Sequence, residues 1–441
     1  MSIRKHLESL YKSFFIDENY EIPLKVINDT EIFNLELERI FSKSWIFLGF
    51  SDEIPREGDY IVRYIGPDPF IIVRGDDGKI RGFFNSCRHR GAILCNAEKG
   101  NAKTFTCPYH GWTYNNVGKL IGMPLREIVF KDLDIEKWGL IEIKIQQYEN
   151  LIFGSEAPSI SLDEYLGEAK YYLDVIFKLT GGMRPVNSPL RFIADFNWKI
   201  GAENFSEDRL HTIMTHKSVV EYGLASPLSR FGYLTPGKNE ISIADLKDVN
   251  GKPVGAFGFR LVPSENIPGY FGFKLKNIEN NYDERFEILR KVSHTVFTIF
   301  PNFSGFIAAD STDYPGPVKP RAPVSLLRVW QPISENRTEV WTWVIVPKEV
   351  DNETAKRVYE ITVSHFGPSG AAEMDDTAIW RGITKVAGGY FANFAFTALK
   401  GGGKDLPVIK DWKGPGIVRP TQFHEECQRT FWKRWVMEMI H

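Results

Sequence analysis

The sequence lacks several features that would place it in a membrane or nucleic-acid class. No apolar run approaches the roughly 18 residues that a membrane-spanning helix needs. The start, from Met1 to Glu8, contains no apolar signal-peptide region. Lys and Arg number 54 against 56 Asp and Glu, and a net charge of −2 gives no electrostatic reason for a nucleic-acid partner. We therefore expect a cytoplasmic protein with no membrane or nucleic-acid partner.

Cofactor loops rich in glycine are missing as well. No Gly-x-Gly-x-x-Gly fingerprint follows a strand and opens a helix, so the chain has no recognisable nicotinamide or flavin site. Redox chemistry would then need electrons from a partner protein. Cysteine is scarce, with four in 441 residues. Three of these, Cys87, Cys95 and Cys107, lie close together, which in a reducing compartment indicates metal binding rather than disulfides.

Aromatic and apolar residues are plentiful by contrast. With 32 Phe, 11 Trp and 43% hydrophobic residues, a chain of this length can bury the cores of two or three domains. Apolar residues at helical spacing predict N-terminal helices, the second capped by Asp29 or Thr30. Short strands then follow, separated by turn signals, over 60–65, 70–74 and 80–84. We predict helices in 1–40, an antiparallel β domain in 41–155 and a further domain in 156–441.

The β domain carries the sharper of two metal motifs. Cys87-Arg-His89 and Cys107-Pro-Tyr-His110 each offer one thiolate and one imidazole. This mixed pairing is typical of a [2Fe–2S] centre with two Cys on one iron and two His on the other. A zinc site with two Cys and two His is the alternative. Because the two loops already supply four ligands, we expect Cys95 to have a packing role.

The second motif lies between Asn204 and His216. Asp208, His211 and His216 provide one carboxylate and two imidazoles within nine positions, most of a 2-His-1-carboxylate iron site. We expect a helix over 201–214. In a regular helix the two imidazoles would point about 140° apart, so the helix must end or bulge between them if both bind one metal; a π-bulge is one way.

A second carboxylate must come from elsewhere in the chain to complete the 2-His-1-carboxylate face. Expected strands at 255–261, 293–300, 305–309, 325–332 and 338–346 are followed by a helix over 353–365 and an amphipathic C-terminal helix that buries Cys427. Strands followed by helices indicate an α+β fold. After the 353–365 helix, Glu373-Met-Asp-Asp376 offers two candidate ligands, Asp375 and Asp376, equally plausible from the residues alone; one would ordinarily be a helix N-cap.

Together these motifs resemble the large α subunit of Rieske-type aromatic-ring-hydroxylating oxygenases. Cys87-Arg-His-Arg-Gly-Ala and Cys107-Pro-Tyr-His-Gly-Trp-Thr-Tyr114 are similar to the family's Rieske centre. Glu203-Asn-Phe-x-x-Asp-x-x-His-x4-His216 is similar to its mononuclear iron motif. The resemblance covers almost the whole chain. It implies an all-β Rieske [2Fe–2S] domain inserted before a helix-grip catalytic domain, in which an antiparallel sheet wraps a helix.

The resemblance also implies roles for single residues. The Rieske ligands would be Cys87, His89, Cys107 and His110, and the Fe(II) ligands His211, His216 and Asp376. Asp208 would orient His211 and bond a Rieske His of the neighbouring subunit, here His110, which gives an electron route between subunits.

The resemblance says less about the substrate pocket. Asn204 would lie near the iron and Phe366 would face the substrate. Leu210 stands where relatives often have Tyr, which leaves the ligand spacing unchanged. Ala371 and Ala372 stand where some relatives have bulky side chains, so we expect a roomy pocket that takes two- or three-ring aromatics.

The implied function is that of a terminal oxygenase component. It would use O2, with electrons from a ferredoxin and an NAD(P)H-dependent reductase, to cis-dihydroxylate an aromatic ring. The implied assembly is a homotrimer, α3, or α3β3 with a small β subunit. A monooxygenase or demethylase built on the same two irons is the alternative. A Rieske electron-transfer protein would resemble only the first domain, and a zinc-binding regulatory module would be colourless.

Overall fold

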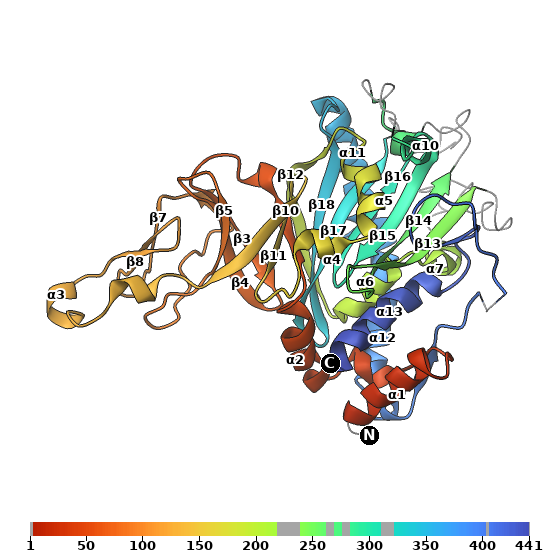
Figure 1. Ribbon diagram of the computed structural model, residues 1–441, viewed down its shortest axis with the longest axis horizontal. Helices are drawn as coiled ribbons and strands as arrows, with labels where there is room; N and C mark the ends of the chain where they lie inside the picture. Colours follow the sequence, from red (N-terminus) through yellow and green to blue (C-terminus); the bar gives the residue numbers. More distant parts are fainter. Residues whose placement is uncertain are drawn as a thin grey trace. The chain divides into compact units, whose positions relative to one another are not determined.

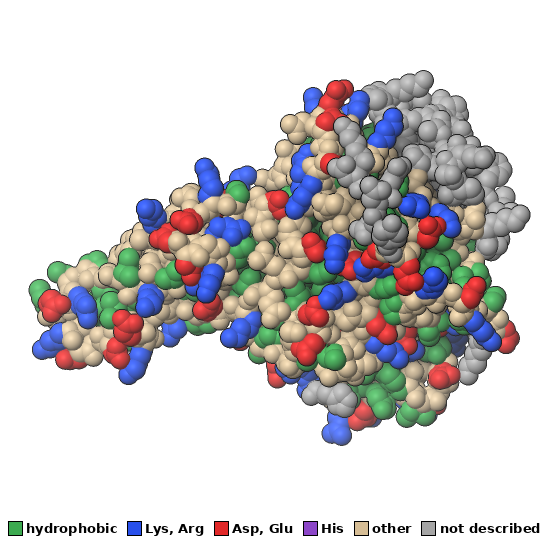
Figure 2. All heavy atoms as spheres, turned by 45° about the horizontal axis from the view of Figure 1, so that its top comes forward, with side chains coloured by type: hydrophobic (Ala, Val, Ile, Leu, Met, Phe, Trp, Pro, Cys, Tyr) green, Lys and Arg blue, Asp and Glu red, His purple; other side chains and the backbone are tan. Residues whose placement is uncertain are grey.

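The computed structural model describes residues 3–217, 239–261, 269–275, 283–309, 322–402 and 405–440. The chain divides into two compact units (Figure 1). The larger unit contains Met1–Ile40 and Asp163–His441, and the smaller unit contains Phe41–Leu162. No helix in the described ranges is long and apolar enough to cross a membrane. Figure 2 shows acidic and basic side chains interspersed over one face, as the near-zero net charge suggests.

The smaller unit is built mainly from antiparallel strands. Its seven-stranded sheet has the order β2-β11-β10-β5-β4-β3-β6, and β7-β8-β9 form a second sheet. The strands are β2 Ile46–Phe50, β3 Asp59–Ile65, β4 Asp68–Arg74, β5 Ile80–Phe84, β6 Lys99–Asn101, β7 Thr104–Thr106, β8 Thr113–Asn115, β9 Leu120–Gly122, β10 Glu142–Tyr148 and β11 Leu151–Ser155. Short helices are η3 Ser51–Glu53, α3 Arg126–Val129 and η4 Ile135–Trp138. The three strands predicted after residue 59 are present as β3, β4 and β5.

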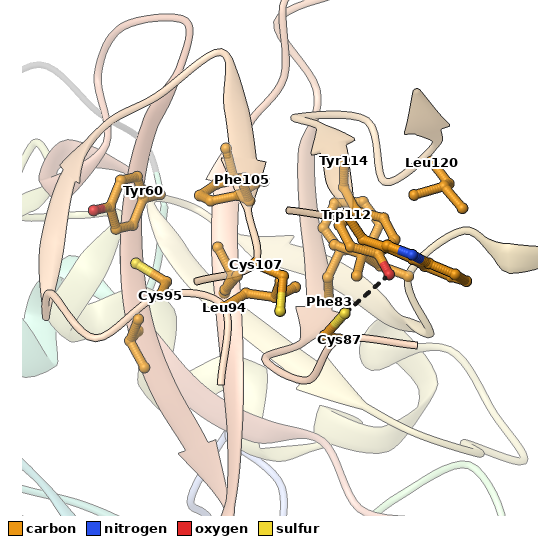
Figure 3. Packing of buried hydrophobic residues seen from close by; sticks show 14 of the residues in the cluster. Tyr60, Phe83, Cys87, Leu94, Cys95, Phe105, Cys107, Trp112, Tyr114 and Leu120 are labelled. Atoms are coloured by element: carbon orange, nitrogen blue, oxygen red, sulfur yellow. Dashed lines mark hydrogen bonds between the residues drawn. The ribbon is translucent and has the colours of Figure 1, made fainter. Parts of the chain in front are cut away.

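Aromatic side chains form the core between these two sheets (Figure 3). Cys87 and Cys107 belong to this core, beside Trp112 and Tyr114. Cys95 is also buried there, on the side of Tyr60, as Figure 3 shows. The two Cys-His loops are therefore anchored in a packed interior.

The N-terminal segment belongs to the larger unit up to Ile40. It contains α1 Ile3–Phe15, β1 Glu21–Pro23, η1 Leu24–Ile27, α2 Thr30–Glu36 and the π-helix η2 Leu37–Phe41. Asp29 caps α2, because its side chain accepts the backbone N–H groups of Glu31 and Ile32. At the other end of α2, the buried carboxylate of Glu36 pairs with Lys199 and accepts the indole N–H groups of Trp198 and Trp435. These bonds tie the segment to two distant parts of the chain.

An eight-stranded antiparallel sheet dominates the larger unit. Its order is β12-β18-β17-β16-β15-β14-β13-β20, and β1 pairs separately with β19 Phe396–Ala398. The strands are β12 Met183–Ala194, β13 Glu240–Lys247, β14 Pro253–Leu261, β15 Val292–Ile299, β16 Phe303–Ala308, β17 Val324–Ser334, β18 Arg337–Pro347 and β20 Ile417–Arg419. The predicted hairpin is present as β17 and β18, and β13, between 240 and 247, was not predicted.

Helices cover both faces of this sheet. They are α4 Leu162–Leu166, α5 Ala169–Phe177, α6 Trp198–Asn204, α7 Arg209–Thr215, η5 Tyr270–Gly272, α10 Phe286–Lys291, α11 Asn352–Phe366, α12 Ala371–Ala387, η6 Tyr390–Asn393 and α13 Glu426–Ile440. On β14, Phe257 and Phe259 pack against Tyr172 of α5, whereas Ala256 packs against Cys427 of α13. Because alternate residues of a strand face opposite sides, α5 and α13 lie on opposite faces. The predicted α+β fold and the burial of Cys427 are confirmed.

The single helix predicted over 201–214 is wrong. Two helices, α6 and α7, are separated by a break at 205–208. Glu207 has a left-handed backbone, with φ of 72°, which a continuous helix does not allow. Asp208 then caps α7, because its carboxylate accepts the backbone N–H groups of Leu210 and His211. A propensity argument misses this break because the deciding contacts involve a polar cap inside an otherwise helical sequence.

Candidate metal centres

The two Cys-His loops of the smaller unit have the same backbone design. In the first, the Cys87 N–H donates to the Ala92 carbonyl at 2.8 Å, and the Gly91 N–H donates to the Cys87 carbonyl at 2.9 Å. In the second, Cys107 pairs with Trp112 at 2.8 Å and Gly111 with Cys107 at 3.0 Å. Gly91 and Gly111 have φ of 74° and 72°, which other L-residues rarely adopt. The matching loops present their ligands in equivalent positions.

The side chains of the loops are grouped by type. The rings of His89 and His110 have centroids 4.6 Å apart, and Trp112 stacks on His89 at 4.9 Å with planes 7° apart. Cys87 and Cys107 are each only 2% exposed. Burial raises the pKa of the Cys87 thiol, and the neighbouring Cys107 adds to this effect. Two sulfurs together and two imidazoles together is the arrangement that a Rieske cluster requires.

Among the described residues, these four side chains do not form a three-ligand cluster of the kind that His211, His216 and Asp376 form. A two-iron cluster, with the sulfurs on one iron and the imidazoles on the other, needs no such single point of convergence. Burial, with the charges of His110 and Arg90, also lowers the pKa of His89, which favours the neutral imidazole that binds metal. The residues present therefore fit a two-iron cluster.

A phenol lies directly beside this candidate cluster. The Tyr114 hydroxyl is 3.5 Å from the Cys87 sulfur and accepts the Arg88 backbone N–H at 3.1 Å. Because its oxygen already accepts one hydrogen bond, its own proton is available to the sulfur. The family motif included Tyr114, but the sequence did not reveal this contact.

The larger unit holds the second candidate centre, on α7 and α12. His211 lies inside α7, whereas His216 is the C-cap of that helix, with φ of −98° and ψ of 20°. The helix thus ends between the two imidazoles, which is one of the two solutions expected, and no π-bulge is present within α7. The rings come to a centroid distance of 5.2 Å. Because α7 ends before His216, the two imidazoles are not held about 140° apart as they would be in a regular helix.

Asp376 brings the third ligand atom to the two imidazoles. Its Oδ1 lies 3.7 Å from His211 Nε2 and 3.3 Å from His216 Nε2. Ligand atoms of the three side chains all lie within 4.8 Å of one another. Asp376 is 3% exposed, while the half-buried histidines border solvent. Two nitrogens and one carboxylate oxygen converging on one point fit a single Fe(II) with open positions.

A further carboxylate lies behind each imidazole. Asp208 Oδ2 is 3.6 Å from His211 Nδ1, and Asp375 Oδ2 is 3.6 Å from His216 Nδ1. The amide of Asn204 lies 3.2 Å from His211 Nδ1. Each ring therefore presents Nε2 to the convergence point and Nδ1 to an acidic side chain, an arrangement that orients metal-binding histidines. The role of Asp375 was not foreseen from the sequence.

The expectation that one of the two Asp residues would be an N-cap is wrong. Both lie inside α12, which begins at Ala371 after the N-cap Gly370. A sequence search for caps favours Asp over Gly, but the corner after α11 sets the start of this helix. Being successive residues of one helix, Asp375 and Asp376 point about 100° apart and meet different atoms of His216.

Burial and charge set the protonation of the candidate iron ligands. Burial raises the pKa of Asp376 to about 7. Burial, together with the charge of His211, lowers the pKa of His216 to about 3. Burial alone would also lower the pKa of His211, but the hydrogen bond and charge of Asp208 outweigh it and raise that pKa. Without a metal, these shifts favour a protonated Asp376 below pH 7 and a neutral His216.

The candidate pocket residues lie on α6 and α7, at the end of α11 and at the start of α12. Asn204 is buried beside His211. Phe366, at the end of α11, packs against Phe306 of β16 with ring centroids 5.1 Å apart. Ala371 is half-buried at the start of α12. Leu210 is 39% exposed on α7.

Sequence reasoning missed one further buried group near these residues. Arg328 of β17 pairs with Glu373 of α12, and both side chains are almost fully buried. The available signal was a charged residue inside the apolar run Leu326-Leu-Arg-Val-Trp330.

Comparison with known proteins agrees with this geometry over both units. Residues 44–133 match the family model "Rieske [2Fe-2S] domain", and residues 162–441 match "Ring hydroxylating alpha subunit (catalytic domain)". The large oxygenase component of a naphthalene 1,2-dioxygenase system from Ralstonia sp. is 34% identical over 420 residues, covering 92% of this chain and 89% of the relative. The α subunit of an N,N-dimethyl phenylurea N-demethylase from Sphingobium sp. (strain YBL2) is 32% identical over 431 residues, covering 95% and 91%.

A solved structure shows the same fold. The crystal structure of naphthalene 1,2-dioxygenase from Rhodococcus sp. bound to indole superposes with a TM-score of 0.89 and 35% identity, covering 99% of this chain and 98% of that one. The catalytic-domain model alone matches more than half of the chain. The protein is therefore an oxidoreductase of the ring-hydroxylating oxygenase α subunit family, with a Rieske [2Fe–2S] domain and a mononuclear-iron catalytic domain.

Proposed function

We propose that this chain is the terminal oxygenase that cis-dihydroxylates an aromatic ring with O2. In this proposal His211, His216 and Asp376 hold Fe(II), and Cys87, His89, Cys107 and His110 hold the Rieske cluster. One observation carries the catalytic assignment: three ligand atoms within 4.8 Å of one another, with a further carboxylate behind each imidazole. A surface cluster of histidines has no reason to be backed in this way.

Each metal centre supplies a separate part of the chemistry when bound. Fe(II) on a 2-His-1-carboxylate face leaves positions open for O2, and the cluster supplies electrons singly. The protein side chains do the rest. Asp208 and Asp375 face the Nδ1 atoms and keep the rings turned, so that each Nε2 points to the metal position. The Asn204 amide also lies close to His211 Nδ1, at 3.2 Å.

The electron route in this proposal runs between subunits. The Asp208 side chain is 30% exposed although it faces His211, so a group outside this chain can reach it. We assign that contact to His110 of the partner subunit in a homotrimer, α3 or α3β3 with a small β subunit. A ferredoxin and an NAD(P)H-dependent reductase would deliver the electrons, because the sequence has no nicotinamide or flavin fingerprint.

For the substrate we propose a bicyclic or polycyclic aromatic. Relatives named for naphthalene and biphenyl are 34% and 31% identical to this chain. In this proposal the Phe306–Phe366 pair forms an apolar wall, and the small side chains of Ala371 and Ala372 at the start of α12 leave space for the larger rings.

A single turnover with isotopic oxygen tests the reaction type. The purified protein is reduced anaerobically, checked for its Rieske EPR signal, mixed with naphthalene, biphenyl, phenanthrene, benzoate or salicylate, and given heavy-isotope O2. We expect a cis-dihydrodiol with both oxygens labelled, from the two- or three-ring compounds. Asp376→Ala should retain the EPR signal and form no labelled product. Reoxidation of wild-type protein without any labelled product would contradict the proposed substrate class.

An N-demethylating monooxygenase is the second candidate. It is favoured by the 32% identity to the phenylurea N-demethylase α subunit over 95% of this chain. The same experiment separates the two reactions when an N,N-dimethyl phenylurea is added to the panel. Loss of a methyl group, with one labelled oxygen in the released formaldehyde and none in the demethylated urea, would favour the demethylase.

A further inference from the structure

Arg328 is a fully buried charge in the middle of an apolar strand. It lies between Leu327 and Val329 on β17, and its side chain is 0% exposed. A guanidinium in such a place must have its charge paired and its N–H groups accepted, because burying a lone charge is very costly. Its contacts therefore indicate which parts of the fold it holds together.

The guanidinium connects the sheet to both helices of the α11–α12 corner. Its Nη1 lies 2.7 Å from the Glu373 carboxylate of α12. Its Nη2 donates to the Phe366 carbonyl at 3.0 Å, at the last residue of α11, and its Nε donates to the Thr342 hydroxyl at 3.1 Å on β18. Three separate elements thus meet on one side chain.

The contact on α12 lies one turn from the candidate iron carboxylate. Glu373 and Asp376 are three residues apart on the same helix, so they share a face. Fixing Glu373 against β17 fixes the rotation and height of α12 at Asp376. The 3.3 Å and 3.7 Å approaches of Asp376 to the two imidazoles depend on that rotation.

The same guanidinium also contacts the other iron-site segment. Its central carbon lies 5.4 Å from the centre of the Phe205 ring and 5.7 Å from that of Phe366. Phe205 follows Asn204, whose amide contacts His211. Arg328 therefore contacts a residue close to the histidine-bearing segment and a residue on the helix that carries Asp376. Both segments are far from Arg328 in the sequence.

We propose that Arg328, through Glu373, is a positioning residue that sets the place of Asp376 relative to His211 and His216. It also fixes Phe366 at the side of the pocket. This inference rests on the proposed function, because it takes these three residues to be the Fe(II) ligands. Arg328 acts through other residues and makes no contact with the ligand side chains that the structure records.

The test compares four variants with one control. Arg328→Met and Glu373→Gln each break the pair, Arg328→Met with Glu373→Gln removes it altogether, and Arg328→Lys keeps the charge without the forked geometry. The control is Arg191→Met, which breaks the Arg191–Glu339 pair, 2.6 Å long, between β12 and β18 of the same sheet. The control thus breaks an ion pair that belongs to the same sheet but does not involve the α11–α12 corner.

The readouts report on the metal site rather than on activity. Each protein is loaded anaerobically with Fe(II), and the EPR spectrum of its nitric oxide adduct and the rate of Fe(II) release to a chelator are measured. We expect Arg328→Met to release Fe(II) about 10- to 100-fold faster, as for other residues that support metal ligands, with a heterogeneous nitrosyl spectrum. Glu373→Gln should shift the same way, Arg328→Lys should be intermediate, and the double variant should not recover the wild-type spectrum. The Rieske signal should be unchanged throughout.

Three results would overturn the inference. In the first, Arg328→Met and Glu373→Gln give wild-type spectra and release rates. In the second, these two variants lose thermal stability but show no change at the metal site. In the third, Arg191→Met changes the spectrum and the release rate as much as they do. If Arg328→Met does not fold, Glu373→Gln and Arg328→Lys decide the question by the same criteria. A wild-type protein without any nitrosyl signal would overturn the proposed function together with this inference, whereas a normal wild-type signal with unchanged variants overturns the inference alone.

Discussion

At the scale of single residues, Asp375 and Asp376 have different roles in the same helix. Asp376 faces the Nε2 atoms of both histidines, and Asp375 faces the outer nitrogen of His216. We expect Asp376→Ala to lose mononuclear Fe(II) while keeping the Rieske EPR signal. Asp375→Ala should still bind Fe(II), with affinity lower by about 10- to 100-fold. Metal analysis after anaerobic loading measures the Fe(II) content of both variants. If Asp375→Ala lost Fe(II) and Asp376→Ala kept it, the roles of the two residues would be exchanged.

The protonation of Asp376 makes Fe(II) binding depend on pH. Burial raises the pKa of Asp376 from 3.8 to about 7, so the metal-free fold favours the protonated form. The contribution of Asp376 to the stability of the metal-free protein should therefore decrease as pH rises from about 4 to 7, where the unfolded chain has already lost this proton. His216, whose pKa is lowered from 6.5 to about 3, contributes the opposite slope between those two values. Fe(II) needs the carboxylate, so its affinity should fall as pH drops below 7, by up to about tenfold per unit.

Calorimetry of anaerobic Fe(II) binding in two buffers checks the release of that proton. Asp376→Asn is the matched control for stability, because position 376 then cannot titrate. The stability of the wild type should fall relative to that of the variant as pH rises from about 4 to 7, and equal slopes in the two proteins would assign the titration to another group.

Tyr114 offers a residue-scale prediction for the Rieske cluster. Its hydroxyl lies 3.5 Å from the Cys87 sulfur, and a hydrogen bond to a cluster sulfur stabilises the more negative reduced state. Tyr114→Phe should lower the reduction potential by roughly 60 mV, about one hydrogen bond for a one-electron couple. An EPR redox titration measures this shift. Tyr109→Phe is the control, since Tyr109 is 60% exposed; an equal shift there would refute the specific contact.

At the scale of elements, the position of α6 depends on one close approach to the sheet. A Cβ on Gly201 would lie 2.5 Å from the Trp330 ring of β17. Gly201→Ala should therefore lower the free energy of unfolding by about 1–3 kcal/mol through overpacking. It should also disturb the nitrosyl spectrum, since α6 ends at Asn204.

Urea unfolding measures this loss, with Gly382→Ala as the matched control. Gly382 lies in α12, where an added Cβ meets nothing within 4 Å. That change should stabilise the protein by about 0.5–1 kcal/mol, because alanine favours a helix over glycine. Equal stabilities of the two variants would show that α6 can shift without cost.

At the scale of the whole molecule, the proposed electron route needs two subunits. Subunits carrying Cys107→Ser lack a Rieske cluster, and subunits carrying Asp376→Ala lack mononuclear iron, so each homotrimer should be inactive. When the two are coexpressed, mixed trimers should recover roughly a quarter of wild-type activity, since each intact iron site needs an intact cluster on one neighbour in the ring.

Adding Asp208→Asn to the subunit with intact iron is the control for the route. Recovery should then disappear while Fe(II) content is retained. If mixed trimers stay inactive, or if Asp208→Asn leaves the recovered activity unchanged, electron transfer through Asp208 between subunits is refuted.

The sequence by itself determined the family and several of the helices and strands. The two motifs carry chemistry in their residue types and spacing, and β3, β4, β5, β17 and β18 follow from short β-rich runs separated by turn residues. The α+β class and the Rieske and mononuclear-iron cofactors were predicted from these patterns and agree with the family. Such features are readable because a period or a motif spans only a few neighbouring positions.

Only the tertiary structure decided how distant residues meet. The pairing of Arg328 with Glu373 and the approach of Asp376 to the two histidines join segments far apart in the chain. The break at Glu207 and the Gly370 start of α12 are local, but they depend on backbone conformations that apolar periodicity does not encode. Asp375 and Asp376 are indistinguishable in sequence, but a helix turns about 100° per residue. The packing of α12 on β17 therefore decides which carboxylate faces both imidazoles, and no local pattern encodes that rotation.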